Sequence, residues 1–191
     1  VLRRVRRLRD DFVASTVKTT EELGERAISG RVRLLAPDRL EVNGEELRAH
    51  KIIIATGSRP IVPAPWNSLG NRLLTTDTLF EQATLPARMA VVGMGPIGAE
   101  MAQALSRLGI KVVAFGGSQA IAGLTDPQVI AVATDLLGRE FPLHLGEKAE
   151  LSMVGEGVQV RAGNIEVVVD CVLAALGRRP NIDNLGFETL G

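Results

Sequence analysis

The sequence of 191 residues is poor in the side chains that most often carry out catalysis, with one cysteine, two histidines and no tyrosine. The single cysteine, Cys171, cannot form a disulfide within the chain, and it lies in the mostly apolar segment 167–176. We therefore expect a buried thiol and not a nucleophile. The absence of tyrosine excludes the Ser-Tyr-Lys constellation of simple NAD-linked dehydrogenases. We expect no metal site.

The sequence also lacks an excess of charge and a long apolar segment. Its 22 basic and 22 acidic residues cancel, so there is no electrostatic basis for nucleic acid as an overall partner. Five arginines at positions 3–9 invite that interpretation, but acidic residues follow at once and a solvated helix face explains them better. No apolar run approaches the roughly 20 residues that cross a bilayer, and no secretory signal is visible. We expect a cytoplasmic protein without a membrane partner.

What the sequence does contain is a glycine-rich turn at residues 91–100, which read Val-Val-Gly-Met-Gly-Pro-Ile-Gly-Ala-Glu. Residues 88–92 predict a strand before the turn and residues 111–115 predict a second strand after it. Between them, apolar residues at helical spacing predict one buried helix face, made of Ile97, Met101, Leu105 and Leu108. The pattern is that of a βαβ unit whose helix ends at Gly109.

Each glycine of this turn has its own physical role. Gly93 permits the tight turn, Gly95 lets the backbone approach phosphate groups, and Gly98 lets the helix pack closely on the sheet. The first turn of the helix presents free N–H groups and the positive end of the helix dipole to that place. The unit therefore predicts a site for the pyrophosphate of a dinucleotide.

Other patterns place further elements along the chain. An apolar stripe that includes Leu8, Phe12, Val13 and Val17 predicts a helix over residues 2–23. The Asn43-Gly44 pair predicts a hairpin turn, and prolines 60, 63 and 65 predict a domain boundary. We also predict strands at 27–35, 40–42, 45–49, a buried strand at 51–55, several strands within 143–176, and helices at 77–82 and from Asp126-Pro127 onward.

Three motifs occur in a fixed order: Ala-Thr-Gly-Ser-Arg-Pro at 55–60, the glycine turn with Glu100, and Leu-Gly-Arg-Arg-Pro-Asn at 176–181. Together they resemble the flavin-dependent pyridine nucleotide-disulfide oxidoreductases, most closely the dihydrolipoamide dehydrogenases. The resemblance covers essentially the whole chain. It implies an α/β fold in which a Rossmann-like NAD(P)-binding domain, residues 61–180, is inserted in a partial FAD-binding domain, residues 1–60 and 181–191.

The resemblance also implies roles for individual residues. Glu100 matches a glutamate that pairs with a lysine near the flavin, a supporting role in catalysis, although that lysine is absent from this chain. Pro96 replaces a bulky residue, which predicts an open nicotinamide pocket. The residues implied to bind FAD are Val32, Thr56, Gly57 and Ser58. Those implied to bind NAD(P) are Gly93, Met94, Gly95, Pro96, Ile97, Gly98, Glu100, Gly116, Ala149 and Gly177.

The choice of nicotinamide cofactor stays open at the residue level. NAD-binding members usually place an acidic residue about 20 positions past the glycine turn to hold the ribose 2′-hydroxyl. Here that position is Gly116, followed by Gly117 and Ser118, and no arginine stands there for a 2′-phosphate either. The resemblance to dihydrolipoamide dehydrogenases favours NAD, and NADP is not excluded.

The implied activity is electron transfer between a dithiol or disulfide, lipoyl or other, and NAD(P) through FAD, in a protein that forms a homodimer at full length. A redox-active Cys-x4-Cys pair cannot occur in a chain with one cysteine. We therefore expect an internal fragment that binds nicotinamide nucleotide and is inactive alone. The alternatives are the glutathione reductase, mercuric reductase or NADH oxidase branches, and a non-catalytic nucleotide-binding module.

Overall fold

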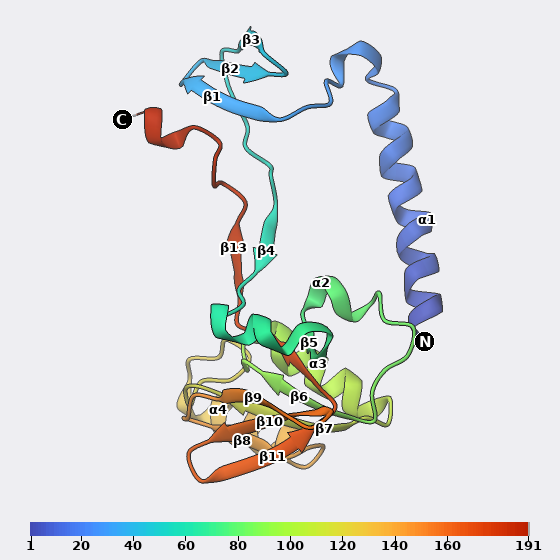
Figure 1. Cartoon of the computed structure of the whole chain (residues 1–191), viewed down its shortest axis with the longest axis vertical. Helices are drawn as coiled ribbons and strands as arrows, with labels where there is room; N and C mark the ends of the chain where they lie inside the picture. The colour runs from blue at the N-terminus through green and yellow to red at the C-terminus, as the bar shows by residue number, and fades with distance from the viewer. Residues whose placement is uncertain (191) are drawn as a thin grey trace. The chain divides into compact units, whose positions relative to one another are not determined.

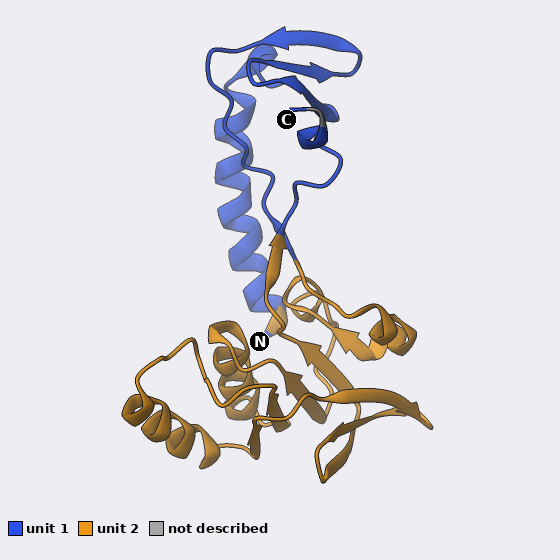
Figure 2. Ribbon diagram, turned by 90° about the vertical axis from the view of Figure 1, so that its left-hand side faces the viewer, with its two compact units in different colours: residues 1, 3–59, 180–191 blue, residues 2, 60–179 orange. Residues whose placement is uncertain are grey.

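The computed structural model describes residues 1–190, and the chain forms two compact units. The smaller unit consists of residues 1, 3–59 and 180–191, and the larger unit of residues 2 and 60–179 (Figure 2). The chain leaves the smaller unit in the short strand β4 (Ser58–Pro60) and returns in β13 (Arg178–Pro180). One domain is thus inserted in another.

The smaller unit contains a long helix and a small antiparallel sheet. Its elements are α1 (Leu2–Glu21), the 3₁₀ helix η1 (Gly24–Arg26), β1 (Val32–Ala36), β2 (Arg39–Val42), β3 (Glu45–Arg48) and the 3₁₀ helix η3 (Phe187–Thr189) (Figure 1). The predicted hairpin is confirmed, because Asn43 and Gly44 have φ values of 56° and 86° and join β2 to β3. Both residue types tolerate the positive φ that this turn requires.

Two predictions about this part of the chain need correction. The helix over residues 2–23 is confirmed, but α1 leaves Leu8, Phe12, Val13 and Val17 exposed, Phe12 by 77%. Residues 51–55 were expected to form a buried strand; they have no regular structure, and Ile53 is 90% exposed. A buried strand needs neighbouring strands for its backbone hydrogen bonds. An apolar run cannot supply those neighbours by itself.

The larger unit is built on a five-stranded parallel sheet in the order β5-β12-β6-β7-β8. A second, antiparallel sheet has the order β11-β10-β9. The strands are β5 (Leu73–Leu74), β6 (Arg88–Val92), β7 (Lys111–Gly116), β8 (Leu143–Leu145), β9 (Glu150–Val154), β10 (Gly157–Ala162), β11 (Ile165–Val169) and β12 (Cys171–Ala174). The helices are the 3₁₀ helix η2 (Ala64–Arg72), α2 (Thr76–Leu79), α3 (Pro96–Arg107) and α4 (Pro127–Gly138) (Figure 1).

Successive residues of the central strand β6 point to opposite faces of the parallel sheet. Met89 and Val91 pack in a core with residues of α3, and Ala90 and Val92 pack in a second core with residues of β10. All four are buried. The sheet is therefore covered on both faces, which explains why β6 is apolar from Met89 to Val92.

The prediction of which face of α3 is buried was wrong in part. Leu105 is buried, but Ile97 and Leu108 are 38% and 48% exposed. The face that packs on the sheet is instead formed by small residues together with Leu105, namely Gly98, Ala99 and Ala102. Close approach of a helix to a strand requires small side chains, so size decided the buried face and apolar spacing alone did not.

An ion pair fixes the beginning of β6 to the beginning of β12. The Arg88 guanidinium donates from Nε and Nη2 to Oδ1 of Asp170 at 3.0 and 2.6 Å, and the Arg88 backbone N–H donates to Oδ2 at 2.8 Å. These hydrogen bonds hold the pKa of the Asp170 carboxyl below its ordinary value of 3.8. The carboxylate therefore stays charged, and it links the first residue of β6 to the residue that precedes β12.

We expect Asp170→Asn to lower the free energy of unfolding by about 1–2 kcal/mol, because it removes a charge-assisted pair. Since folding lowers this pKa, the stabilisation is present above the unfolded value of 3.8 and is lost as the pH falls below it. Urea unfolding at neutral pH and at pH values below that point measures both effects. Asp135→Asn, in the exposed pair with Arg139, is the control and should change stability little. Equal losses in the two variants would contradict the expectation.

The single cysteine lies on β12 and packs against the core that contains α3. It is half-buried, and burial raises the pKa of the Cys171 thiol, so this group stays protonated at neutral pH. Within residues 1–190, no three His, Cys, Asp or Glu side chains are grouped so as to hold a metal ion. No helix in the described part of the chain has the length and apolar character needed to cross a membrane.

Candidate functional site

The glycine-rich turn joins β6 to α3 through contacts that other residues could not make. Gly93 has a φ of 102°, and its N–H donates to the Phe115 carbonyl oxygen at 2.8 Å. A Cβ atom on Gly93 would lie 2.4 Å from the Ala175 carbonyl oxygen. A Cβ atom on Gly98 would lie 1.7 Å from the Gly93 carbonyl oxygen. These two glycines let the helix begin directly against the strand, as their spacing predicts.

Gly95 has a different environment from the other two glycines. It is exposed, and no atom lies within 4 Å of the place where its Cβ would be. Pro96, the first residue of α3, has no N–H, and the Ala99 N–H donates to the Gly95 carbonyl oxygen at 3.0 Å. The N–H groups of Ile97 and Gly98 therefore lack an acceptor in the helix. Open space beside free N–H groups and the positive end of a helix suits a phosphate group.

The far end of α3 is held by Glu140, which follows α4. Its carboxylate accepts hydrogen bonds from Gln103 Nε2 at 2.7 Å and from Arg107 Nη2 at 2.7 Å. The hydrogen bond from Arg107, followed by that from Gln103, lowers the pKa of the Glu140 carboxyl. The contact joins the carboxyl-terminal half of α3 to the segment that follows α4.

A pocket of about 800 Å³ lies at the carboxyl ends of β6, β7 and β12. In a doubly wound sheet, ligands bind at this end of the strands. Its volume is in the range of small-molecule sites, roughly 300–1,000 Å³. The lining residues are Pro63 and Trp66, residues 92–95, residues 115–118 with Ala120 and Gly123, Lys148 and Ala149, and residues 175–177.

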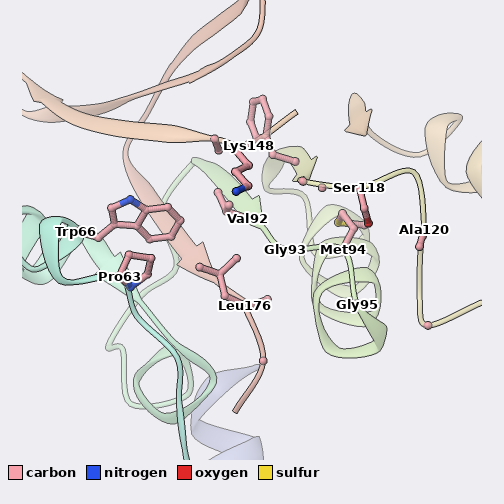
Figure 3. Close-up of a pocket in the computed structure, with 17 residues that line it drawn as sticks. Pro63, Trp66, Val92, Gly93, Met94, Gly95, Ser118, Ala120, Lys148 and Leu176 are labelled. Carbon is pink, nitrogen blue, oxygen red and sulfur yellow. The ribbon is translucent and has the colours of Figure 1, made fainter. Parts of the chain in front are cut away.

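One wall of this pocket is apolar and the opposite part is polar. The apolar part includes Pro63, which precedes η2, Trp66, which lies in η2, and Leu176, which follows β12 (Figure 3). Trp66 is 9% exposed and packs in the core with residues of β10, so its indole is held in place. The side chains of Lys148 and Ser118 also reach the pocket (Figure 3). A flat ring fits the apolar wall, while phosphate groups fit the glycine turn and the lysine.

Most of the residues expected to bind NAD(P) lie in this pocket or beside it. Gly93, Met94, Gly95, Gly116, Ala149 and Gly177 line the pocket itself. Pro96 and Ile97 line a smaller cavity of about 90 Å³ that shares Gly95 and Gly177 with it. Gly98 is buried beneath the turn and lines neither. Glu100 is exposed on α3 and lines neither of these two cavities.

The residues expected to bind FAD lie at two places in the smaller unit. Val32 lines a groove with Arg31, Arg33 and Asn43. None of Thr56, Gly57 or Ser58 lines that groove. The hydroxyl of Thr56 donates to the Asn181 carbonyl oxygen at 2.6 Å, and the Asn181 N–H donates to the Gly57 carbonyl oxygen at 2.9 Å. Within the described residues these positions do not form one cavity that could hold FAD.

Trp66 and Lys148 are among the pocket residues that the sequence did not predict to bind the nucleotide. Trp66 comes from η2, about 30 residues before the glycine turn, and Lys148 from the loop between β8 and β9. Neither belongs to a recognisable motif. The one available signal was the position of Lys148 immediately before Ala149, which the resemblance had already placed at the nucleotide.

A family profile described as pyridine nucleotide-disulphide oxidoreductase matches residues 10–191. The chain is 34% identical over 165 residues to a glutathione reductase of Burkholderia cepacia, with 84% of the chain and 36% of the relative covered. It is 31% identical over 171 residues to a dihydrolipoyl dehydrogenase of Chlamydia trachomatis, with 85% and 37% covered. It is 30% identical over 177 residues to a mercuric reductase of Staphylococcus aureus, with 90% and 32% covered.

Two solved structures of flavoprotein reductases and related proteins have a similar fold. LpdA from Mycobacterium tuberculosis superposes with a TM-score of 0.82 at 25% identity, covering 97% of this chain and 44% of that one. The HOCl-induced flavoprotein disulfide reductase RclA from Escherichia coli superposes with a TM-score of 0.74 at 26% identity, covering 86% and 39%. The chain thus spans between 32% and 37% of the length of the three curated relatives above.

Proposed function

The chain belongs to the pyridine nucleotide-disulphide oxidoreductase family, and on that premise we propose that its larger unit binds a nicotinamide dinucleotide for an FAD-dependent, dihydrolipoamide dehydrogenase-like oxidoreductase. In this proposal electrons pass between a dithiol or disulfide and NAD(P) by way of FAD. NAD is the acceptor that the resemblance favours, and NADP is taken up below. The chain itself supplies binding and orientation of the nucleotide.

The observation that carries the proposal is the open position at Gly95. Free N–H groups of the first turn of α3 stand beside it, and no protein atom occupies the space above it. Close contacts explain why positions 93 and 98 must be glycine, but no protein contact explains the exposed glycine at position 95. The pyrophosphate of a dinucleotide fits this place, and the pocket beyond it has the volume for the nucleosides.

Family membership leaves the branch of the family undecided. The relatives above carry the names glutathione reductase, dihydrolipoyl dehydrogenase and mercuric reductase at nearly equal identity, 34%, 31% and 30%. We propose the dihydrolipoamide dehydrogenase branch because of the motif sequences, with a lipoyl or other thiol as substrate of the whole protein. The homodimer, the cytoplasmic location and the supporting role of Glu100 belong to the same proposal.

The single tryptophan makes a direct test available. Trp66 lines the pocket, and tryptophan emission overlaps the absorption of reduced nicotinamide. We expect addition of NADH or NADPH to quench Trp66 emission with sensitised nucleotide fluorescence, and calorimetry of the same solution to give the same dissociation constant. Trp66→Phe should remove the fluorescence signal, and calorimetry should still detect binding with lower affinity, because phenylalanine keeps a smaller aromatic ring at the pocket wall. A folded chain that gives neither signal nor heat with either nucleotide would refute the proposal.

A further inference from the structure

The pocket of the larger unit contains a charge that the proposed function does not yet use. Among the residues that line it, Lys148 is the one with a charged side chain, and none is acidic. Lys148 is exposed, and its side chain extends into the pocket (Figure 3). A dinucleotide site with a cation and without a carboxylate favours a ligand that carries additional negative charge.

The backbone holds this lysine beside the end of β7. The Gly146 N–H donates to the carbonyl oxygens of Gly116 at 2.8 Å and of Ser118 at 3.2 Å. Gly146 itself has a φ of 94°, so the β8–β9 loop turns sharply there. Two residues later, the stem of Lys148 lies against Gly117, because a Cβ atom on Gly117 would be 3.6 Å from Lys148 Cγ. Lys148 is therefore fixed next to residues 116–118.

Residues 116–118 mark the ribose end of the site. In a dinucleotide-binding fold, the residue at the end of the second strand reads the 2′ position of the adenosine ribose, and a carboxylate there selects NAD. Here that residue is Gly116, and it has little space for a side chain, since a Cβ atom would lie 2.6 Å from Leu145 Cδ2. The group that normally repels a 2′-phosphate is absent, and Leu145 occupies its space.

Within the described part of the chain, the charge of Lys148 has no partner. In residues 1–190 it takes part in no ion pair or side-chain hydrogen bond. Its chain neighbour Glu147 lies against Gly163, where a Cβ atom would be 3.3 Å from Glu147 Cγ. Lys148 also lines an adjacent pocket of about 470 Å³ together with Glu147 and Glu150, but neither glutamate lines the dinucleotide pocket. The ammonium group is thus available to a ligand.

We propose that Lys148, assisted by the hydroxyl of Ser118, binds the 2′-phosphate of NADP(H), so that this site takes NADP(H) at least as tightly as NAD(H). The inference rests on the proposed function, because it assigns a selectivity to the same nucleotide site. In this proposal Lys148, from the β8–β9 loop, influences the selection between NAD(H) and NADP(H), which Gly116 at the end of β7 does not determine. The lysine is a point charge on a flexible stem, so NAD(H) remains a ligand.

The test compares wild type, Lys148→Ala and Lys111→Ala by calorimetry with NADPH and NADH. Lys111→Ala is the matched control, since it removes an exposed lysine from the opposite end of β7. We expect Lys148→Ala to weaken NADPH about tenfold, the effect of one charge-assisted hydrogen bond, and to change NADH less than about twofold. Lys111→Ala should leave both unchanged.

A smaller pair of probes isolates the phosphate. 2′,5′-ADP carries the 2′-phosphate and 5′-AMP does not, so wild type should prefer 2′,5′-ADP and Lys148→Ala should lose that preference. Equal weakening of NADH and NADPH in Lys148→Ala would assign the lysine to the pyrophosphate and overturn the inference, as would no change with either. Failure of folded wild type to bind any of the four nucleotides would instead refute the proposed function.

Discussion

Replacing Gly98 with alanine is expected to remove most nucleotide binding and to destabilise the larger unit. A Cβ atom there would lie 1.7 Å from the Gly93 carbonyl oxygen, a backbone atom that cannot rotate away. Helix α3 must therefore shift from β6, which moves its first turn relative to Gly95. We expect the free energy of unfolding to fall by about 2–3 kcal/mol and the affinity for NADH to fall at least tenfold, roughly the effect of overpacking a core.

Urea unfolding followed by Trp66 emission measures the first effect, and calorimetry with NADH measures the second. The control is Gly138→Ala at the end of α4, where no atom lies within 4 Å of the new Cβ. Alanine has the higher helix propensity, so Gly138→Ala should leave stability unchanged or raise it by up to about 1 kcal/mol. If Gly98→Ala behaved like the control, the close contact between α3 and β6 would not exist in solution.

The same contact explains why the glycine turn was predictable from the sequence. A side chain at Gly98 would collide with the backbone five residues earlier, and a side chain at Gly93 would collide with the backbone that follows β12. Only glycine fits at these two positions, so the sequence motif reveals the geometry of the turn. The hairpin at Asn43-Gly44 was predictable for a similar reason, because the turn demands positive φ at both positions. In each case a local constraint allows few residue types.

Burial was less predictable, because it depends on what lies opposite. Ile97 and Leu108 match the helical spacing of a buried face, yet both are more exposed than Ala99 and Ala102. The spacing shows that a helix is amphipathic but not how closely its neighbour approaches. The burial of Ile53 was not predictable for the same reason. It lies in an apolar run, but no strand among residues 1–190 pairs with that run in the structure, and its side chain is exposed.

The pocket walls were the least predictable part of the site. Trp66 and Lys148 enter it from η2 and from the β8–β9 loop, which tertiary packing brings to the glycine turn. Each side chain is ordinary in its own segment. Their role depends on which chain segments lie close together in the fold. For Lys148, the Gly146 N–H donates to the Gly116 carbonyl oxygen at 2.8 Å, which places the β8–β9 loop beside the end of β7.

Placing a carboxylate at the end of β7 is expected to make the site prefer NADH over NADPH. Gly116→Glu would place a negative charge where the 2′-phosphate of NADP(H) is proposed to bind, and a like charge at a binding site opposes the ligand strongly. We expect the affinity for NADPH to fall about tenfold or more relative to wild type, while the affinity for NADH, which lacks the 2′-phosphate, should fall less. Calorimetry with both nucleotides gives the ratio.

A side chain at position 116 would collide with Leu145, so the variant needs a second substitution. The Leu145 Cδ2 atom would lie 2.6 Å from the new Cβ, so Gly116→Glu alone displaces a side chain that packs against the core of the larger unit. Gly116→Glu combined with Leu145→Ala makes room, and Leu145→Ala alone is the control for loss of packing. Because the control carries no new charge, it should affect NADH and NADPH equally, whereas the double variant should disfavour NADPH. A double variant that still bound both nucleotides as the control does would mean that residue 116 lies away from the ribose, and Lys148 with it.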